Sequence, residues 1–285
     1  MLDKDKKIGI IGLGLLGGSY AQGLSGAGFD VCGVDIDEKA VEKALQRGWI
    51  SKGGPDPSIL KDRDIVISAL YPQAFVKWIA ENQEHLKSDS ILTDVTGIKK
   101  MIIAQIDGSL RKDVEYIACH PMAGRESRGI DYADASQFEQ ANFIIVATEK
   151  NSDEAKRCAS DLAETLKFRK VSYLDPDTHD RIIGFVSQLC HVIAISLMNI
   201  GDDPSLVDYT GDSFRDLTRI ADINEELWPE LFIGNKENLI EEIDRLVNEM
   251  EQMKDLIERE DILSLKEKMV TATIARRAFD KKKKA

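Results

Sequence analysis

A glycine-rich segment near the amino terminus constrains the fold of this chain more than any other feature. The apolar run 8–12 leads into residues 12–17, which read GLGLLG, and a helical pattern follows at once. In this G-x-G-x-x-G spacing the first glycine permits a tight turn, the second lets the backbone approach a pyrophosphate, and the third lets the helix pack on the strand. A helix N-terminus also supplies free N–H groups for phosphate oxygens. The residues expected to line this dinucleotide site are Gly12, Gly14, Leu15, Leu16 and Gly17.

An acidic residue follows at the spacing that a dinucleotide fold requires. Asp35 ends the second apolar run, 18 residues after Gly17. A carboxylate there accepts hydrogen bonds from the hydroxyls of the adenosine ribose and repels a 2′-phosphate. We therefore predict NAD, rather than NADP, as the cofactor.

The first half of the chain alternates short runs rich in Val and Ile with helix-length stretches, as parallel α/β sheets do. The strand-like runs span residues 8–12, 31–35, 64–70, 90–94, 116–120 and 143–147. The helical stretches between them include residues 15–26, 38–47 and 73–85. This order predicts an α/β fold class with an N-terminal Rossmann-type doubly wound sheet.

The pattern changes after residues 175–177, which read DPD. No further strand is expected there, and helices are predicted over residues 180–201, 213–222, 224–232, 236–259 and 262–280. In the fourth of these helices apolar residues recur at three- and four-residue steps, which indicates core packing or a dimer seam. We predict a nucleotide-binding domain over residues 1–172 and an all-α helical domain over residues 173–285.

The net charge limits the classes of binding partner that the protein is expected to have. The chain has 38 Lys and Arg against 50 Asp and Glu, a formal net charge of −12. A nucleic-acid binder needs basic surface to displace counterions, so we expect no nucleic-acid partner. We interpret the basic run 281–284 as a solvated tail.

One apolar stretch raises the question of whether the protein crosses a membrane. Residues 182–201 contain no Asp, Glu, Lys or Arg and are long enough to cross a bilayer. They also include Ser187, Gln188 and His191, which are costly against lipid, so we expect a helix buried at the centre of the helical domain and no membrane partner. The charged residues 1–7 lack the apolar core of a secretion signal, which predicts a cytoplasmic protein. The four scattered cysteines are expected to be reduced thiols.

Two loops at the ends of predicted strands carry candidate site residues. Residues 90–99 read SILTDVTGIK and place Thr96 and Gly97 at the edge of the sheet where ligands bind in open α/β folds. The alternative is an ordinary helix start with Thr96 as its cap. The next strand ends at His120, before a turn that contains proline and glycine. Histidine titrates near neutral pH and is a suitable base for the oxidation of an alcohol.

The predicted helical domain places polar groups within apolar helices. Ser187, Gln188 and His191 share one face, and this stripe either pairs with other protein groups or lines a cavity. Arg219 lies in an apolar turn. A buried guanidinium needs a carboxylate partner, and the two candidates are Asp216 and a substrate carboxylate.

With these motifs the sequence resembles the prephenate/arogenate dehydrogenase family of tyrosine biosynthesis over nearly the whole chain. The matching segments are GLGLLGGS at 12–19, DVTGIK at 94–99, HPMAG at 120–124, HD at 179–180, SQLCH at 187–191 and LTRIA at 217–221. HPMAG and TRIA in this order behind a nucleotide fold are specific, whereas the glycine segment alone is not. The family fold is a Rossmann domain followed by a helical domain that forms a homodimer.

The resemblance implies an NAD-dependent oxidative decarboxylation of prephenate to 4-hydroxyphenylpyruvate, carbon dioxide and NADH. It assigns His120 as the catalytic histidine, which binds the ring hydroxyl and takes its proton. Arg219 matches the arginine that binds a substrate carboxylate, and His191 matches a second substrate-binding histidine. Glu126 matches an acid near the substrate's side chain. Arg125 is an added cation that would strengthen binding of a dianionic substrate or point to solvent.

The sequence departs from the family at substrate-binding positions. Many members carry serine where Gly97 stands, so Thr96 or a backbone N–H would have to hold the substrate's ring hydroxyl. Some members have histidine and threonine at two other positions, which here are Gln188 and Arg125.

The net charge bears on how such a protein would attract its ligands, because prephenate and NAD are both anions. Attraction has to be local. We expect it from the N-terminus of the first helix and from Arg219, with Lys99 and Arg125 as further cations.

Three other functions fit parts of the pattern. Arogenate dehydrogenase, which would give tyrosine directly, differs only in the side chain of its substrate. A related NAD-dependent hydroxyacid dehydrogenase usually relies on a lysine base, which residues 180–201 lack. A catalytically silent NAD-binding sensor needs neither His120 nor Arg219. We also expect a stand-alone catalytic subunit, without a chorismate mutase-like segment or an ACT regulatory domain.

Overall fold

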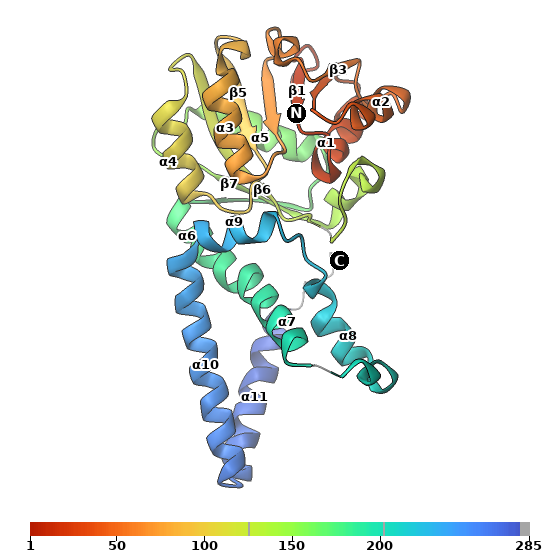
Figure 1. The fold of residues 1–285 in the computed structure, drawn as a ribbon. Coiled ribbons are helices and arrows are strands. Elements are labelled where there is room, and N and C mark those ends of the chain that lie inside the picture. Colours follow the sequence, from red (N-terminus) through yellow and green to blue (C-terminus); the bar gives the residue numbers. More distant parts are fainter. Residues whose placement is uncertain (125, 202, 280–285) are drawn as a thin grey trace. The chain divides into compact units, whose positions relative to one another are not determined.

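The computed structural model describes residues 1–124, 126–201 and 203–279 (Figure 1). Its described residues form an eight-stranded sheet in the spatial order β3-β2-β1-β4-β5-β6-β7-β8. The strands are β1 Ile8–Ile11, β2 Val31–Val34, β3 Lys52–Gly54, β4 Ile65–Ser68, β5 Ser90–Asp94, β6 Val114–Pro121, β7 Asn142–Val146 and β8 Lys170–Leu174. Neighbouring strands run parallel except β6 and β7, which are antiparallel. The predicted α/β fold class is confirmed.

The two strands that the sequence did not reveal are the two edges of the sheet. β3 and β8 stand at the ends of the strand order, and neither contains a fully buried residue. An edge strand has one neighbour and lies partly in water, so it does not need the Val- and Ile-rich composition of a central strand. The central strands are largely buried and overlap the predicted apolar runs.

Helices cover both faces of the sheet. They are α1 Leu15–Gly26, α2 Glu38–Gln46, α3 Pro72–Asn82, α4 Lys100–Ser109 and α5 Asp153–Thr165. Leu24 of α1 and Leu162 of α5 belong to one hydrophobic core, together with side chains of α2. Phe75 of α3 and Ile106 of α4 belong to the other, and Figure 1 shows α3 and α4 together on one face. The sheet is therefore wound on both faces, which leaves its strand ends free to carry a site.

The chain beyond β8 is helical, as predicted. The elements are α6 Pro176–Ile183, α7 Leu189–Ile200, α8 Asp212–Thr218, α9 Leu227–Gly234, α10 Lys236–Glu258 and α11 Ile262–Ala278. A π-helical turn, Gly184–Gln188, joins α6 to α7, where a single regular helix was expected. Packing divides the chain into compact units, Met1–Lys236 and Glu237–Ala285. The domain division predicted at residues 172 and 173 follows the change from sheet to helix and stays a prediction.

Among the described residues, one helix is long and apolar enough to cross a membrane by length and composition alone. It runs from Pro176 to Ile200 and has a mean hydropathy of 1.7, and only 28% of its apolar window is buried within the chain. Phe185, Val186 and Met198 are exposed. The expectation of a helix buried nearly all round is therefore wrong for a single chain, because apolar side chains of this helix remain exposed.

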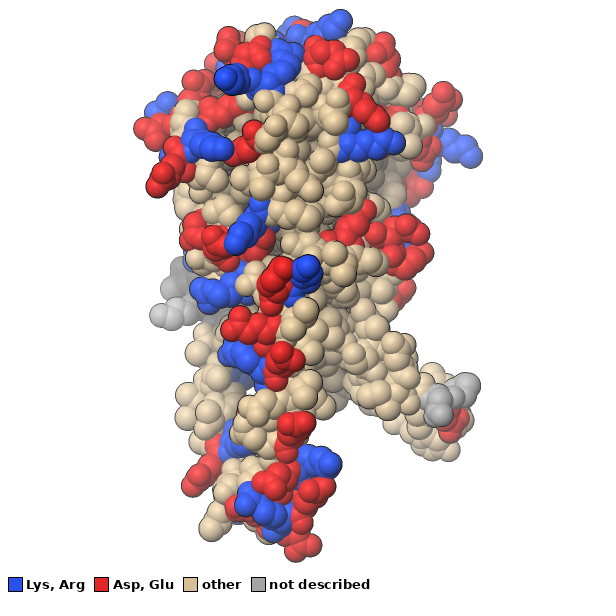
Figure 2. Space-filling view, turned by 60° about the vertical axis from the view of Figure 1, so that its left-hand side comes forward, with Lys and Arg blue, Asp and Glu red and all other residues tan. Residues whose placement is uncertain are grey.

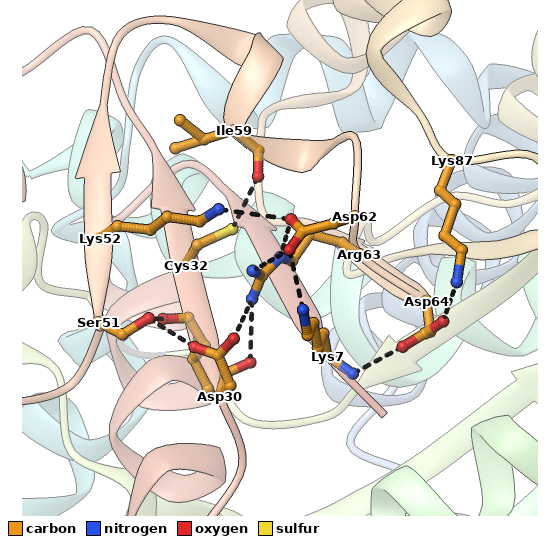
Figure 3. A network of polar contacts seen from close by, with 11 residues as sticks. Lys7, Asp30, Cys32, Ser51, Lys52, Ile59, Asp62, Arg63, Asp64 and Lys87 are labelled. Carbon is orange, nitrogen blue, oxygen red and sulfur yellow. Dashed lines mark hydrogen bonds and ion pairs between the residues drawn. The ribbon is translucent and has the colours of Figure 1, made fainter. Parts of the chain in front are cut away.

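A network of charged side chains joins three strands at the side of the sheet where the strands begin (Figure 3). Arg63 is only 2% exposed, and its guanidinium donates to Asp30 at 2.8 Å and to Asp62 at 2.9 Å. The ammonium groups of Lys7 and Lys52 lie 3.1 and 3.4 Å from Asp62. Because Lys7, Asp30 and Arg63 each lie just before a strand, the network ties β1, β2 and β4 together at their amino ends.

Surface charge is mixed on the face drawn in Figure 2, where Asp and Glu side chains are interspersed with Lys and Arg. The basic run 281–284 lies outside the described residues. The absence of a nucleic-acid partner stays a prediction.

Candidate active site

The glycine segment forms a tight cradle between β1 and α1. Gly12 has a φ of +87°, a left-handed conformation that favours glycine. A Cβ at Gly17 would stand 1.8 Å from the carbonyl oxygen of Gly12, so the close approach of helix and strand requires glycine. At Gly14 nothing lies within 4 Å of the corresponding position, which leaves the backbone open to a ligand. The roles predicted for the three glycines thus have counterparts in the structure, and these residues fit a dinucleotide.

The remaining predicted cofactor contacts surround this cradle. Leu15 and Leu16 begin α1, which has no side-chain cap, so its first N–H groups are available to phosphate oxygens. The carboxylate of Asp35 accepts the N–H of Leu13 at 2.5 Å and that of Asp37 at 2.8 Å. Asp35 therefore holds the glycine loop in place, a role that the sequence did not reveal. Each carboxylate oxygen has a second lone pair for a ribose hydroxyl.

A fully buried ion pair holds the loop that follows β5. Lys99 Nζ lies 2.6 Å from Asp94 Oδ2, and both side chains are 0% exposed. Asp94 Oδ1 accepts the hydroxyl of Tyr116 at 2.9 Å and the backbone N–H of Cys119 at 3.3 Å. The expectation that Lys99 attracts ligands from solvent is therefore wrong, because its ammonium is enclosed and already paired.

Thr96 lies inside the same network. Its buried hydroxyl donates to Asp94 and accepts from Lys99 Nζ at 3.1 Å. A hydroxyl has a single proton, so its donor capacity is used within the loop. The alternative role of Thr96 as a helix cap is wrong, because the N-cap residue of α4 is Lys99. A contact of Thr96 with cofactor or substrate stays a prediction.

His120 lies one residue before the end of β6 and connects to two polar groups of α6. Its Nδ1 is 2.9 Å from Nε2 of His179, and Nδ1 of His179 is 2.7 Å from Oδ1 of Asp180. Burial, with contributions from His179 and Lys99, holds the pKa of His120 well below 6.5. His120 is therefore neutral near pH 7 and can accept a proton. The only sequence signal for its partners was the adjacent His and Asp in the first turns of a helix.

Gly97 borders the nitrogen of His120 that is not directed at His179. A Cβ at Gly97 would lie 3.8 Å from Nε2 of His120 and 3.4 Å from the side chain of Leu231. These are ordinary contact distances. The position predicted to border the substrate is thus next to the candidate base, and the small residue leaves space beside it.

A second group of predicted residues comes together around Arg219. Its guanidinium donates to Glu126 at 2.7 Å, and the two side chains are 62% and 33% exposed. The ring of His191 packs against Trp228 with a centroid distance of 3.6 Å. Burial lowers the pKa of His191, and Glu126 and Arg219 act on it in opposite directions. Arg219 is therefore not a buried cation, and its carboxylate partner is Glu126 instead of Asp216.

The structure does not place two other predicted substrate-binding residues, Gln188 and Arg125, in this group. Gln188 is buried, its Nε2 donates to the carbonyl of Leu231 at 3.0 Å, and its Oε1 accepts from Asn235 at 2.8 Å. This placement departs from the substrate contact expected of Gln188, because both polar atoms are used inside the protein. Arg125 lies outside the described residues.

Comparison with known proteins agrees with the geometry. Family models match residues 21–172 as the prephenate dehydrogenase nucleotide-binding domain and residues 175–271 as the prephenate dehydrogenase dimerization domain. A prephenate dehydrogenase from Lactococcus lactis is 31% identical over 268 residues, which cover 90% of this chain and 72% of that protein.

Two solved structures resemble the whole chain. Prephenate dehydrogenase from A. aeolicus, in complex with hydroxyphenyl propionate and NAD+, has a TM-score of 0.89 at 27% identity, covering 98% of this chain and 100% of that one. Synechocystis arogenate dehydrogenase has a TM-score of 0.82 at 25% identity, covering 96% and 99%. The fold, the glycine cradle and these matches together show that the chain belongs to the prephenate dehydrogenase family.

Proposed function

We propose that this protein is an NAD-dependent prephenate dehydrogenase, which converts prephenate to 4-hydroxyphenylpyruvate, carbon dioxide and NADH in tyrosine biosynthesis. The observation that carries the proposal is a neutral His120 whose Nε2 borders Gly97, in a chain of this family whose glycine cradle fits a dinucleotide. The oxidation of an alcohol needs a base in this state to take the hydroxyl proton.

Each part of the site has a role in this proposal. Nε2 of His120 binds the ring hydroxyl and takes its proton as the carbinol carbon is oxidised. Bound NAD supplies the hydride acceptor. The backbone of residues 12–17 holds its pyrophosphate, and Asp35 holds its ribose. Arg219 contacts Glu126 through one nitrogen, so its exposed guanidinium keeps further N–H donors for a substrate carboxylate, beside His191.

A second candidate is arogenate dehydrogenase, which the likeness to the Synechocystis enzyme favours. The two substrates differ in a keto or an amino group on the side chain. Glu126 is the residue suited to this difference, because its carboxylate attracts an ammonium group. In the structure Arg219 occupies that carboxylate at 2.7 Å, which reduces its attraction for a second cation and favours prephenate.

Steady-state rates with prephenate and with arogenate, each with NAD and with NADP, test the proposal. We expect the highest kcat/KM for prephenate with NAD. A higher kcat/KM for arogenate would replace the first candidate by the second. No turnover with either substrate would overturn the assignment as a dehydrogenase of this pathway.

We further propose a cytoplasmic homodimer formed through the helical domain, without a membrane or nucleic-acid partner. The match to a dimerization domain supports it. So does the number of exposed apolar side chains on the long helices, which include Val247, Met250 and Ile257 of α10 and Met269, Val270 and Ile274 of α11. A dimer seam would also cover the apolar face of Pro176–Ile200. Sedimentation of the purified protein without detergent should give the mass of two chains, and a stable monomer would contradict this.

We propose the domain division at residues 172 and 173. The family models support it, since one ends at residue 172 and the other begins at residue 175. The later division found by packing is consistent with α9, whose Leu231 belongs to the same hydrophobic core as Phe75 of α3 and Ile106 of α4.

A further inference from the structure

Three polar side chains, Asp180, His179 and His120, form a chain from α6 to the end of β6, and the proposed function uses only its last member. The links measure 2.7 Å between Asp180 Oδ1 and His179 Nδ1, and 2.9 Å between His179 Nε2 and His120 Nδ1. His179 and Asp180 are both buried. Water therefore cannot replace either link at low cost.

The donors around Asp180 set the direction of both links. The carboxylate of Asp180 accepts the backbone N–H groups of Lys99 and Lys100, each at 2.9 Å. The remaining contact of Oδ1 is with Nδ1 of His179, which must donate to it. Burial lowers the pKa of His179, so the ring is neutral near pH 7 and carries a single N–H. Nε2 of His179 is then an acceptor, and Nδ1 of His120 is the donor to it.

Asp180 is held by elements that pack against it. Its carboxylate closes the start of α4 through the two backbone N–H groups, and its own carbonyl accepts from Asn235 Nδ2 at 2.8 Å. Rotation of the carboxylate or of the His179 ring would leave buried donors unpaired. The protein therefore fixes one end of the chain before any ligand binds.

We propose that His179 and Asp180 are positioning residues that lock His120 in the Nδ1–H tautomer, so that Nε2 accepts the substrate's proton. This inference rests on the proposed function and adds two residues to it. The proton passes from the substrate hydroxyl to Nε2 while Nδ1 keeps its own, and no proton moves to Asp180. The carboxylate stabilises the positive charge that His120 then carries, as the third member of a catalytic triad does for its histidine.

Other charged groups face this chain of side chains. Lys99 acts on both His120 and His179 and lowers the pKa of each, whereas Asp94 raises that of His179. Lys99 and Asp94 are paired with each other at 2.6 Å. Asp180 is therefore the carboxylate that reaches His120 through hydrogen bonds.

The tautomer is directly measurable because the chain has four histidines. Side-chain ¹⁵N–¹H spectra of the full-length labelled protein show which ring nitrogen carries the proton, and His85→Asn and His191→Asn variants assign the other two rings. We expect His120 and His179 to be protonated at Nδ1 only, from about pH 8 to about pH 6.5.

Two outcomes separate this inference from the proposed function. A His120 ring protonated at Nε2, or an average of both tautomers, would overturn the inference even in a fully active enzyme. An inactive protein with both rings protonated at Nδ1 would contradict the proposed function and leave the tautomer lock standing.

Asp180→Asn tests the lock through kinetics. The amide replaces one acceptor oxygen by a donor, so we expect a shift of His120 towards the Nε2–H tautomer and a loss of roughly 10³-fold in kcat, with little change in KM. Asp175→Asn is the matched control, because the Asp175 side chain caps α6 through the N–H of Thr178 at 2.9 Å and makes no hydrogen bond to His179 or His120. Equal losses in the two variants would overturn the lock, because the loss would then not depend on the link between Asp180 and His179.

A second pair of variants tests the lock even if Asp180→Asn does not fold. His179→Gln offers an acceptor oxygen to Nδ1 of His120, whereas His179→Leu offers none. We expect roughly a 10²-fold loss of kcat and mixed tautomers in His179→Leu, and partial recovery of both in His179→Gln. Equal behaviour of the two variants would contradict the lock.

Discussion

A cation is buried both at the side of the sheet where its strands begin, here called the amino edge, and at the side where they end, the carboxyl edge, but the surroundings of the two cations differ. At the amino edge Arg63 is buried, while its partners Asp30 and Asp62 keep 42% and 46% of their side chains exposed. At the carboxyl edge Lys99 and Asp94 are both completely buried. The first network joins the ends of strands, and the second supports the loop beside His120.

The two sites differ in the free energy that is lost when their charged groups are removed from water. Where the strands begin, only the Arg63 guanidinium is fully removed from water, because the half-exposed carboxylates of Asp30 and Asp62 keep much of their hydration. A fully buried pair loses the hydration of both ions, and only good geometry with further hydrogen bonds offsets that loss. Asp94 receives such bonds from Tyr116 and Cys119. The costly arrangement stands where the candidate active site needs a rigid polar loop.

The largest expected effect is a loss of turnover when the proposed base, His120, is removed. In His120→Asn we expect kcat to fall about 10²- to 10⁴-fold, because the proton acceptor is removed, while the affinity for NAD is retained. Steady-state kinetics and titration with NAD measure the two effects. His85→Asn, outside the site, is the control. Near-normal turnover of His120→Asn would remove the base from the proposed reaction.

Removal of the buried cations compares the two edges directly. Lys99→Met leaves Asp94 without its counter-ion in a dry environment, so the free energy of unfolding should fall by about 3–5 kcal/mol. Arg63→Met leaves carboxylates that regain water, and we expect a loss of about 2 kcal/mol from its hydrogen bonds to charged groups. Chemical denaturation measures both. Equal losses would contradict the distinction between the edges.

Substrate binding at the carboxyl side should depend on Arg219. In Arg219→Ala we expect KM for prephenate to rise about 10- to 100-fold with a small change in kcat, because a ground-state contact to a carboxylate is lost. Arg215→Ala, which removes another exposed arginine of the same region, paired with Asp212, should leave KM unchanged. An unchanged KM in Arg219→Ala would mean that Arg219 serves only to pair Glu126.

Cofactor choice should respond to the charge of Asp35. In Asp35→Asn an oxygen remains for the N–H of Leu13, while the repulsion of a 2′-phosphate is removed. We expect the preference for NAD over NADP, as a ratio of kcat/KM values, to fall by roughly tenfold. Asp37→Asn changes a nearby exposed carboxylate and serves as the control. A ratio that is the same in Asp35→Asn would exclude this carboxylate as the discriminator.

The smallest effect should appear in acid, in different pH ranges for the two edges. Burial holds the pKa of His120 and of His179 below 6.5 in the folded protein, so the unfolded chain binds more protons below that pH. The free energy of unfolding should therefore begin to fall as the pH drops below about 6.5. Hydrogen bonds from Arg63 hold the pKa of Asp62 below 3.8, so its contribution is present above about pH 4 and is lost as the pH falls further.

Denaturation at a series of pH values checks these ranges. The His120→Asn variant should show a smaller loss as the pH falls below about 6.5, while the contribution of Asp62 below about pH 4 is unchanged. Identical profiles for this variant and the parent protein would contradict the assignment of the first range to His120 and His179.

Much of the fold was predictable because central strands and long helices carry local patterns. Buried strands need apolar residues on both faces, so they stood out in the sequence. β3 and β8 did not, since an edge strand is only half covered. The π-helical turn Gly184–Gln188 was also missed, because its residues have the same apolar spacing as a regular helix.

The site was predictable in its chemistry and less so in its contacts. His120, Arg219 and His191 were proposed as site residues because their side chains lie at apolar or strand-end positions and match the family's motifs, and their roles stay predictions. Gln188 was assigned to substrate on the same grounds, but a polar residue on an apolar helix fits a cavity and an internal partner equally well. Its bonds to Leu231 and Asn235 show which of the two applies.

The sequence by itself determined the order of the central strands and the long helices along the chain, the glycine cradle and the position of a histidine at a strand end, because each depends on residues that are close together in the chain. Only the tertiary structure decided the pairings. His120 and His179 are 59 residues apart, and Arg219 and Glu126 are 93 apart. Such contacts depend on how β6, α6 and the segments that carry Glu126 and Arg219 come together in the folded chain, which no local pattern encodes.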